Sequence, residues 1–200
     1  MEQDGIRIRF SQTCKTLNSL LRNLTKHVLG SVHVLYIMNI LFRETDNHGT
    51  FSELNYRPQN HTQVVCLAPH GGNVEPNTDL QALQLASRFN ADVWATQGNV
   101  DDKYGIAFNR FHTSSKNSTV RDFPLFQPFL DMDSKYQYGV GFHVMGGDGF
   151  VIGGRASDEI LGLVETELRK RFDYEIRVAY EKGKRSGKNP NNFVNSVSTE

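Results

Sequence analysis

Residues 64–68 read VVCLA, and residues 69–78, PHGGNVEPNT, follow them directly. A short apolar run that ends at a proline is typical of a strand buried on both faces of a sheet. Thr78 can act as the N-cap of a following helix, because Gln81 stands three positions further on, as in a capping box. Apolar residues then recur at helical spacing through residue 89. The order of strand, polar loop and helix predicts an α/β unit.

Similar alternation continues along the chain. Further strands are predicted at residues 92–95, 105–108, 140–144 and 174–180, and a further helix is predicted that either Ser157 or Asp158 can cap. Strands that alternate with helices favour parallel pairing, because each helix returns the chain to the same edge of the sheet. We therefore expect an α/β fold with a mixed, mainly parallel sheet that is flanked by helices.

Composition narrows the function classes. The 200 residues include 22 Lys and Arg and 22 Asp and Glu, so no net charge favours nucleic acid as a partner. Cys14 and Cys66 are the two cysteines, which excludes a disulfide scaffold, and Cys66 lies in the apolar run where a buried thiol is expected. The polar cluster at residues 44–50 marks a boundary. We expect residues 1–45 to be an N-terminal extension of unknown role and residues 46–200 to form the domain.

The most apolar segment, residues 28–42, has two interpretations. It reads VLGSVHVLYIMNILF and is shorter than the roughly 20 apolar residues that a membrane-spanning helix needs. It also lies too far from the start of the chain for a signal peptide. The segment is expected to be a buried helix or upstream sequence outside the fold. No membrane partner is predicted, and the expected location is cytoplasmic or released.

A histidine with paired glycines close behind it occurs at the end of two predicted strands. His70 precedes one pair, with Glu75 five positions on, and His143 precedes the other. Two imidazoles and one carboxylate form the ligand set of many catalytic zinc centres. On spacing alone, Glu75 is equally consistent with a structural turn that satisfies helix amides. Either histidine alone is consistent with an ordinary hydrogen-bonded side chain.

Residues 68–78, APHGGNVEPNT, resemble the A-P-H-G-G-x-I-E-P-x-T signature of the poly-γ-glutamate hydrolase family of phages and bacteria. The resemblance continues in the family's order through residues 51–54, 111–115, 142–154 and 189–195, and it covers approximately residues 45–200. It implies a fold similar to that of zinc carboxypeptidases.

The same resemblance implies Zn²⁺ as the cofactor, held by His70, Glu75 and His143. His112, within the segment FHTSS, is expected to support the site through hydrogen bonds or to replace the third ligand. Val144 stands where the family commonly has glycine. The family's general-base glutamate lies in a strand after the asparagine-rich loop. It is therefore expected beyond Glu200, in a C-terminal end of the domain that this sequence does not include.

The implied activity is zinc-dependent hydrolysis of γ-glutamyl amide bonds in poly-γ-glutamate. Each residue of this polymer carries an α-carboxylate, so cationic or amide groups should line its groove. Arg155, Arg121 and Asn191 are the candidates. Two alternatives remain: a zinc deacylase acting on another amide or ester, such as an aminoacyl ester, and a zinc-binding remnant that is catalytically impaired.

Overall fold

The computed structural model of the protein describes residues 38–46, 48–58, 62–100, 107–113, 122–144, 149–179 and 187–200. All of them belong to one compact unit, Met38–Glu200. No helix within these ranges is long and apolar enough to cross a lipid bilayer.

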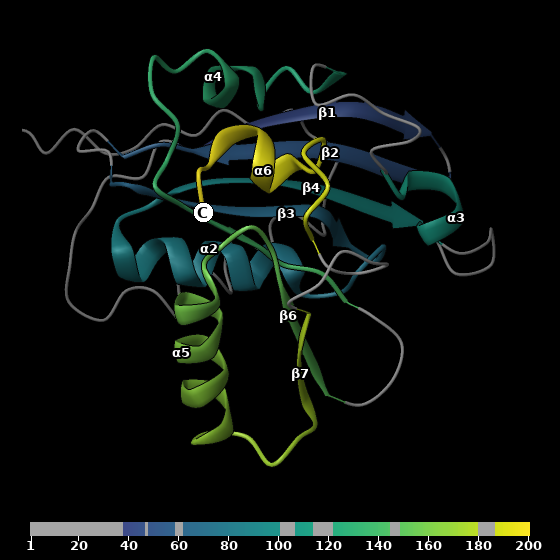
Figure 1. The fold of residues 1–200 in the computed structure, drawn as a ribbon. Helices are drawn as coiled ribbons and strands as arrows, with labels where there is room; N and C mark the ends of the chain where they lie inside the picture. Colours follow the sequence, from purple (N-terminus) through teal and green to yellow (C-terminus); the bar gives the residue numbers. More distant parts are fainter. Residues whose placement is uncertain are drawn as a thin grey trace, which may run out of the picture. The chain divides into compact units, whose positions relative to one another are not determined.

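A five-stranded sheet forms the centre of this unit (Figure 1). Its strands, in spatial order, are β1 (Met38–Asp46), β2 (Gly49–Tyr56), β4 (Asp92–Val100), β3 (Val64–Gly72) and β5 (Tyr138–Gly141). β3 pairs in parallel with both β4 and β5, whereas β2 pairs antiparallel with β1 and β4. β2 therefore runs opposite to the other four strands, and the predicted mixed, mainly parallel sheet is confirmed.

Helices cover both faces of this sheet, and the alternation along β3 explains why. Cys66 and Ala68 face a core formed with α2 (Thr78–Phe89), whereas Val65 and Leu67 face the opposite core. Successive side chains of a strand point to opposite faces, so a continuous apolar run buries both. The second core contains Trp94 and lies under α4 (Gln127–Leu130) and α6 (Phe193–Val197), as Figure 1 shows.

The remaining elements form a smaller group. β6 (Phe150–Gly153) and β7 (Ile176–Ala179) pair in parallel, and α5 (Asp158–Arg169) connects them and packs against both. The short helix α3 (Ala107–Phe111) follows β4. The Ser157 side chain accepts a hydrogen bond from the Ile160 N–H, so the predicted start of α5 is confirmed.

Cys66 is fully buried and free, as its sequence context predicts. Burial raises the pKa of its thiol to about 12, because the thiolate would lose its hydration. This cysteine is therefore an apolar core residue without reactive character.

Three local predictions are wrong. Residues 38–42 belong to β1 and not to a helix, and β1 pairs with β2 along its length. The strand predicted at residues 105–108 is replaced by α3, at least from Ala107 onward. Asn77, and not Thr78, precedes the first helical residue of α2, and its φ of 71° places it in the left-handed region. Asparagine tolerates this conformation better than most residues do.

Most of the predicted N-terminal extension, and the part of the apolar segment that precedes β1, lie outside the described residues. Residues 1–37, which include Cys14 and most of residues 28–42, lie outside the described residues. β1 starts at Met38, ahead of residue 46, where the domain was expected to start.

Candidate metal centre

The loop between β3 and α2 brings two candidate ligands together. His70 lies near the end of β3, and the Glu75 N–H donates to the His70 carbonyl at 2.7 Å, which closes a tight turn. The Thr78 hydroxyl and N–H both donate to the Glu75 carbonyl, at 2.9 and 3.3 Å. The chain between strand and helix is therefore fixed by hydrogen bonds at each end.

This turn requires the glycines that follow His70. A Cβ at Gly71 would lie 2.4 Å from the Thr96 carbonyl oxygen and 2.6 Å from Cβ of Asp79. Gly72 has a φ of 71°, which other residues rarely adopt. The buried Asp79 carboxylate also receives a hydrogen bond from the Gln97 amide at 2.6 Å. The paired glycines thus allow β4 and the first turn of α2 to approach the loop closely.

β5 delivers the third candidate. It pairs in parallel with β3, so His143 leaves the sheet at the same edge as His70. Nδ1 of His70 lies 3.2 Å from Oε1 of Glu75, and Nδ1 of His143 lies 3.3 Å from Oε2. The two Nδ1 atoms are 3.2 Å apart. The structure therefore brings together His70, Glu75 and His143.

Hydrogen bonding determines which nitrogen of His70 carries its proton. Nε2 forms a short hydrogen bond with the backbone carbonyl of Thr113, which can only accept, so Nε2 must donate. In the neutral ring, the lone pair is then on Nδ1 and faces Glu75. Metal-ligating histidines typically have this arrangement, with the second ring nitrogen donating to a carbonyl or carboxylate.

The set of ligand atoms fits a zinc ion. Atoms bound to zinc at about 2.0–2.1 Å in a tetrahedral arrangement are about 3.3 Å from one another. The two Nδ1 atoms, 3.2 Å apart, match that spacing, and each of them lies 3.2–3.3 Å from a different oxygen of the Glu75 carboxylate. Electron-rich atoms that face one another this closely need a proton or a cation between them, and both histidines and Glu75 are ligands that zinc accepts.

Glu75 is held in the form that a metal needs. Burial alone would raise the pKa of its carboxyl group, but in the metal-free cluster hydrogen bonds from His143 and His70, which require a proton on each Nδ1, outweigh that effect and lower it to about 2. The Val144 N–H also donates to Oε2 at 3.1 Å. The side chain is 8% exposed, so Glu75 is a buried carboxylate that stays ionised at neutral pH.

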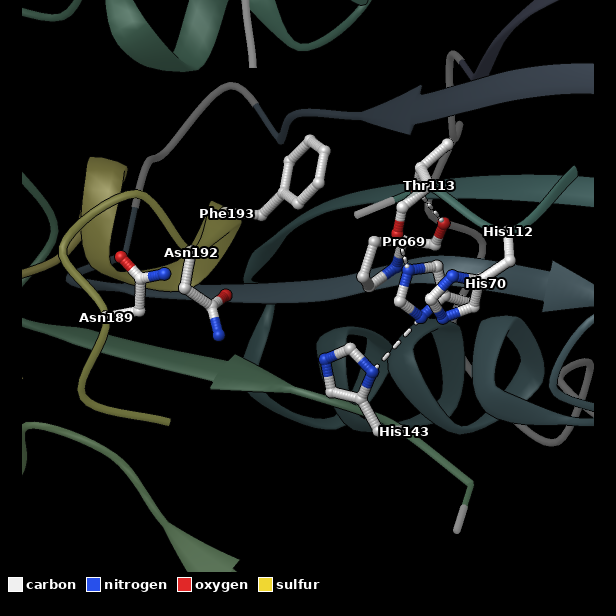
Figure 2. A pocket seen from close by; sticks show the side chains of 8 residues that line it. All are labelled: Pro69, His70, His112, Thr113, His143, Asn189, Asn192 and Phe193. Atoms are coloured by element: carbon white, nitrogen blue, oxygen red, sulfur yellow. Dashed lines mark hydrogen bonds between the residues drawn. The ribbon is translucent and has the colours of Figure 1, made fainter. Parts of the chain in front are cut away.

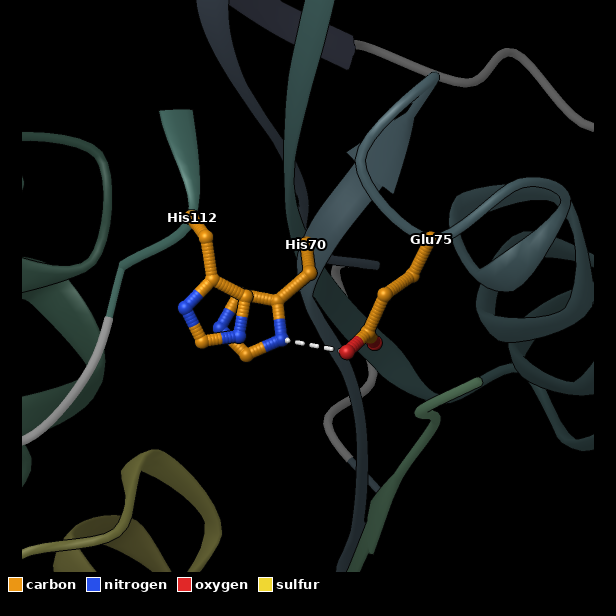
Figure 3. A group of neighbouring side chains, drawn as sticks. All are labelled: His70, Glu75 and His112. Atoms are coloured by element: carbon orange, nitrogen blue, oxygen red, sulfur yellow. Dashed lines mark ion pairs between the residues drawn. The ribbon is translucent and has the colours of Figure 1, made fainter. Parts of the chain in front are cut away.

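His112 stacks beside this cluster (Figure 3). Its ring lies 4.1 Å from that of His70, and the Phe108 ring lies 4.1 Å from His112. The ligand-type atoms of His70, Glu75 and His112 all lie within 4.8 Å of one another. Burial and the neighbouring His70 lower the pKa of His112. His112 is thus next to the centre, whereas His143 directly contacts both other candidates.

A pocket of about 200 Å³ opens at the cluster (Figure 2). One side of it is formed by Pro69, His70, His112, Thr113 and His143, and the other side by Asn189, Asn192 and Phe193. The first side comes from the ends of β3 and β5 and from the residues that follow α3, and the second side comes from the start of α6 and the segment before it. Ligands commonly bind beyond the carboxyl ends of strands in open α/β sheets.

The predicted substrate-binding residues do not line this pocket. Arg155 and Asn191 are exposed and lie outside its lining, and Arg121 lies outside the described residues. Asn192 and Asn189 occupy the lining instead. A signal for Asn192 was present in the sequence, since an asparagine directly before an apolar Phe-Val pair is typical of a helix N-cap.

Comparisons with known proteins agree with this architecture. A family model described as poly-gamma-glutamate hydrolase matches residues 41–200. The solved structure of a bacteriophage poly-gamma-glutamate hydrolase aligns with a TM-score of 0.55 and 19% identity, over 91% of this chain and 72% of that one.

A putative hydrolase from Agrobacterium vitis S4 aligns with a TM-score of 0.31 and 14% identity, over 72% of this chain and 50% of that one. A search of curated proteins found no match. The family match covers most of the sequence, including the loop that carries His70 and Glu75. The chain belongs to the poly-gamma-glutamate hydrolase family.

Proposed function

We propose that this chain is a zinc-dependent hydrolase of the γ-glutamyl amide bonds in poly-γ-glutamate. One observation carries the proposal: the Nδ1 atoms of His70 and His143 lie 3.2 Å apart, and each lies 3.2–3.3 Å from an oxygen of the Glu75 carboxylate. Membership of the poly-gamma-glutamate hydrolase family supports the substrate class.

The metal would be held by His70, Glu75 and His143, whose surroundings favour metal binding in different ways. The Thr113 carbonyl fixes the proton of His70 on Nε2, so that Nδ1 is available for ligation. Glu75 is ionised and buried, which favours a bound cation. The His143 side chain is 43% exposed, so it borders the open side of the site. A zinc ion there would supply Lewis-acid polarisation of the amide carbonyl and of the attacking water.

The side chains around the ligands limit how the substrate can approach. His112 is packed between Phe108 and His70, which restricts the His70 ring to one orientation. Phe193 gives the opposite side of the pocket an apolar wall. A substrate amide would therefore enter between this wall and the exposed edge of His143.

The family resemblance assigns proton transfer to the leaving nitrogen to a glutamate in a strand after the asparagine-rich loop, at a position beyond Glu200. The last described residues pair with the free edge of β5: the Gly139 N–H donates to the Glu200 carbonyl at 2.7 Å, and the Glu200 N–H donates to the Gln137 carbonyl at 3.0 Å. Tyr136 and Ser198 form a parallel bridge. Further residues in this direction would run beside β5 toward His143, which supports the assignment.

The test measures the chain length of poly-γ-glutamate during incubation with this protein and with a form extended past Glu200. Each protein is assayed with and without a chelator, and zinc is quantified in both. We expect chelator-sensitive cleavage by the extended form. The shorter form should be about 10²–10⁴-fold slower, the usual contribution of general acid–base catalysis.

α-Linked polyglutamate is the matched control substrate, because it has the same composition and charge with a different linkage. We expect it to remain intact. If zinc-loaded extended protein leaves poly-γ-glutamate intact, the proposal is wrong, and cleavage of an aminoacyl ester by that protein would then identify a deacylase.

A further inference from the structure

The side chain of Asn192 has one determined orientation in the pocket. Its Oδ1 accepts a hydrogen bond from the Val194 N–H at 3.2 Å. Because a backbone N–H can only donate, the oxygen of the amide must face the helix, and the NH₂ group must face away from it. Figure 2 shows Asn192 extending away from α6 on the side where His143 lies. The NH₂ group is thus presented to the pocket.

Asn189 has a related arrangement on the same wall. Its Oδ1 accepts from the Asn191 N–H at 3.0 Å, which again assigns the oxygen to the backbone. Asn191 itself is exposed, with its side chain outside the pocket lining. Asn189 and Asn192 are therefore both oriented by main-chain donors, while Asn191, directly before Asn192 in the sequence, is exposed.

The wall that carries Asn192 is fixed to the core. The Phe193 ring stacks on Trp94 at 5.0 Å and is 5% exposed. Val194 packs against β5 so closely that a Cβ on Gly141 would lie 2.7 Å from its Cγ2. The Asn195 amide donates to the carbonyls of Gly187 and Asn189, both at 2.7 Å. Asn192 is held in place before any ligand binds, which lowers the entropic cost of recognition.

The chemistry of the lining indicates what this NH₂ group would bind. The described lining residues contribute imidazole, hydroxyl, carbonyl, amide and phenyl groups, with no lysine or arginine among them. The Asn192 NH₂ is a donor directed into a pocket whose opposite side holds the candidate metal ligands. An acceptor with negative charge, such as a carboxylate, is the matching partner, because hydrogen bonds to charged groups are the stronger ones.

We propose that Asn192 donates to the α-carboxylate of the glutamyl residue that supplies the nitrogen of the scissile bond, with Asn189 beside it. The inference rests on the function proposed above. In a γ-linked polymer every amide nitrogen is attached to a carbon that carries a free carboxylate. In an α-linked chain that position holds the next peptide group, except at the C-terminus. A donor at this place therefore selects γ-linkages along the whole polymer.

The test measures binding, so that it does not depend on turnover. Dissociation constants are determined by calorimetry for γ-glutamylglutamate and for the analogue whose second residue carries an α-carboxamide. The zinc-loaded full chain should bind the carboxylate ligand about 10- to 100-fold more tightly, the range for a hydrogen bond to a charged group. Asn192→Asp should abolish this preference, because it replaces the NH₂ donor with a carboxylate oxygen.

Two further variants distinguish loss of the NH₂ donor from the effects of an added negative charge and of altered stability. Asn191→Asp adds the same charge one residue away on an exposed side chain, and it should retain the preference. Asn192→Ser keeps a helix-capping oxygen without an NH₂ group, and it should lose the preference without adding charge. Asp caps helices as well as Asn does, so thermal unfolding of Asn192→Asp should match that of the parent protein.

The outcomes distinguish this inference from the function on which it rests. If Asn192→Asp and Asn192→Ser retain the ligand preference, the inference is wrong, while cleavage of poly-γ-glutamate by the extended protein would still support the proposed function. Equal loss in Asn191→Asp would show a long-range charge effect and would also overturn the inference. If the parent protein neither binds the carboxylate ligand nor cleaves the polymer in its extended form, both proposals fail.

Discussion

Glu75 and Asp92 are buried carboxylates at opposite ends of the parallel strands β3 and β4, and their partners differ in kind. Asp92 opens β4, where Nε of Arg57 lies 3.3 Å from its Oδ2 and the Tyr136 hydroxyl donates to the same atom. Glu75 follows β3 and faces two imidazoles.

The difference shows which of the two clusters can exchange a proton for a metal. A guanidinium keeps its protons at any physiological pH. Burial and the hydrogen bond to Asp92 raise the pKa of Tyr136, so its hydroxyl also stays protonated. An imidazole nitrogen, by contrast, can carry either a proton or a metal ion. The Asp92 cluster is therefore a structural ion pair, and the Glu75 cluster is the candidate site.

The strongest test of this contrast removes the imidazoles. We expect His70→Ala and His143→Ala each to reduce the zinc content from about one ion per chain to almost none, because three protein ligands are needed for a typical catalytic site. Zinc is measured by atomic emission after dialysis, with Asp92→Asn as the matched control that keeps its metal. Full zinc occupancy in a double variant without His70 and His143 would refute the assignment.

The reverse test disrupts the ion pair. Asp92→Asn should lower the free energy of unfolding by about 1–3 kcal/mol, because Arg57 and Tyr136 lose a charged acceptor. Arg57 is partly exposed, which limits the loss. Denaturant titration of the chelated protein measures the effect, and the zinc content should not change. Loss of zinc at unchanged stability would mean that the two clusters are not separate in function.

Acid should weaken the metal-free Glu75 cluster. The folded-state pKa of Glu75, about 2, is below its ordinary value of 4.5. Its ionised form therefore stabilises the fold above about pH 4.5, and this contribution is lost as the pH falls toward about 2. We expect Glu75→Gln to show a smaller loss of unfolding free energy between about pH 5 and about pH 3. If the unfolding free energies of the parent protein and of Glu75→Gln changed equally with pH, the lowered pKa of Glu75 would be contradicted.

His112 provides a smaller effect on the same cluster. Because it restrains His70 by stacking, His112→Ala should weaken zinc binding about tenfold while keeping one ion per chain. A competition titration with a chromophoric chelator measures the affinity, and Phe108→Ala, which removes the outer member of the stack, should have a weaker effect. Complete loss of zinc from His112→Ala would instead make His112 the third ligand.

The smallest effect is expected from the start of the sequence. Deletion of residues 1–37, which precede β1, should leave the zinc content unchanged. Deletion of residues 1–45 would remove most of β1 and should reduce thermal stability, because β2 loses its antiparallel partner. A folded, soluble deletion variant of residues 1–37 that no longer binds zinc would show that the domain starts earlier than residue 38.

The sequence predicted those helices and strands whose formation depends on residues close to one another in the chain. The apolar run of β3 and the Ser157 cap of α5 are examples, and both are confirmed. β1 was mistaken for part of a helix, since an apolar run with little alternation does not distinguish the two structures. Its pairing with β2 is a tertiary contact that overrides local preference.

The sequence predicted the candidate site where its residues belong to short sequence motifs. His70 and Glu75 share one motif, His143 stands in a second histidine and paired-glycine pattern, and the family resemblance joined the three as one expected ligand set. Asn191 was among the candidates for the substrate groove, and the pocket lining contains Asn192, one position further on. Which of two adjacent asparagines faces the pocket depends on where the backbone turns into α6, and the composition of the NPNN loop does not determine that turn.

The parallel pairing of β3 with β5 also sets the order of events when the chain folds. His70 and His143 are 73 positions apart, and they meet only after β5 has docked beside β3. Contacts of such long range form slowly, because the chain loses conformational entropy when the long loop closes, before the contacts can stabilise the fold. The nascent or unfolded chain offers only the local pair of His70 and Glu75, which is too few ligands to retain zinc firmly. Metal uptake would therefore follow sheet assembly, and it would lock a finished fold in place without nucleating it.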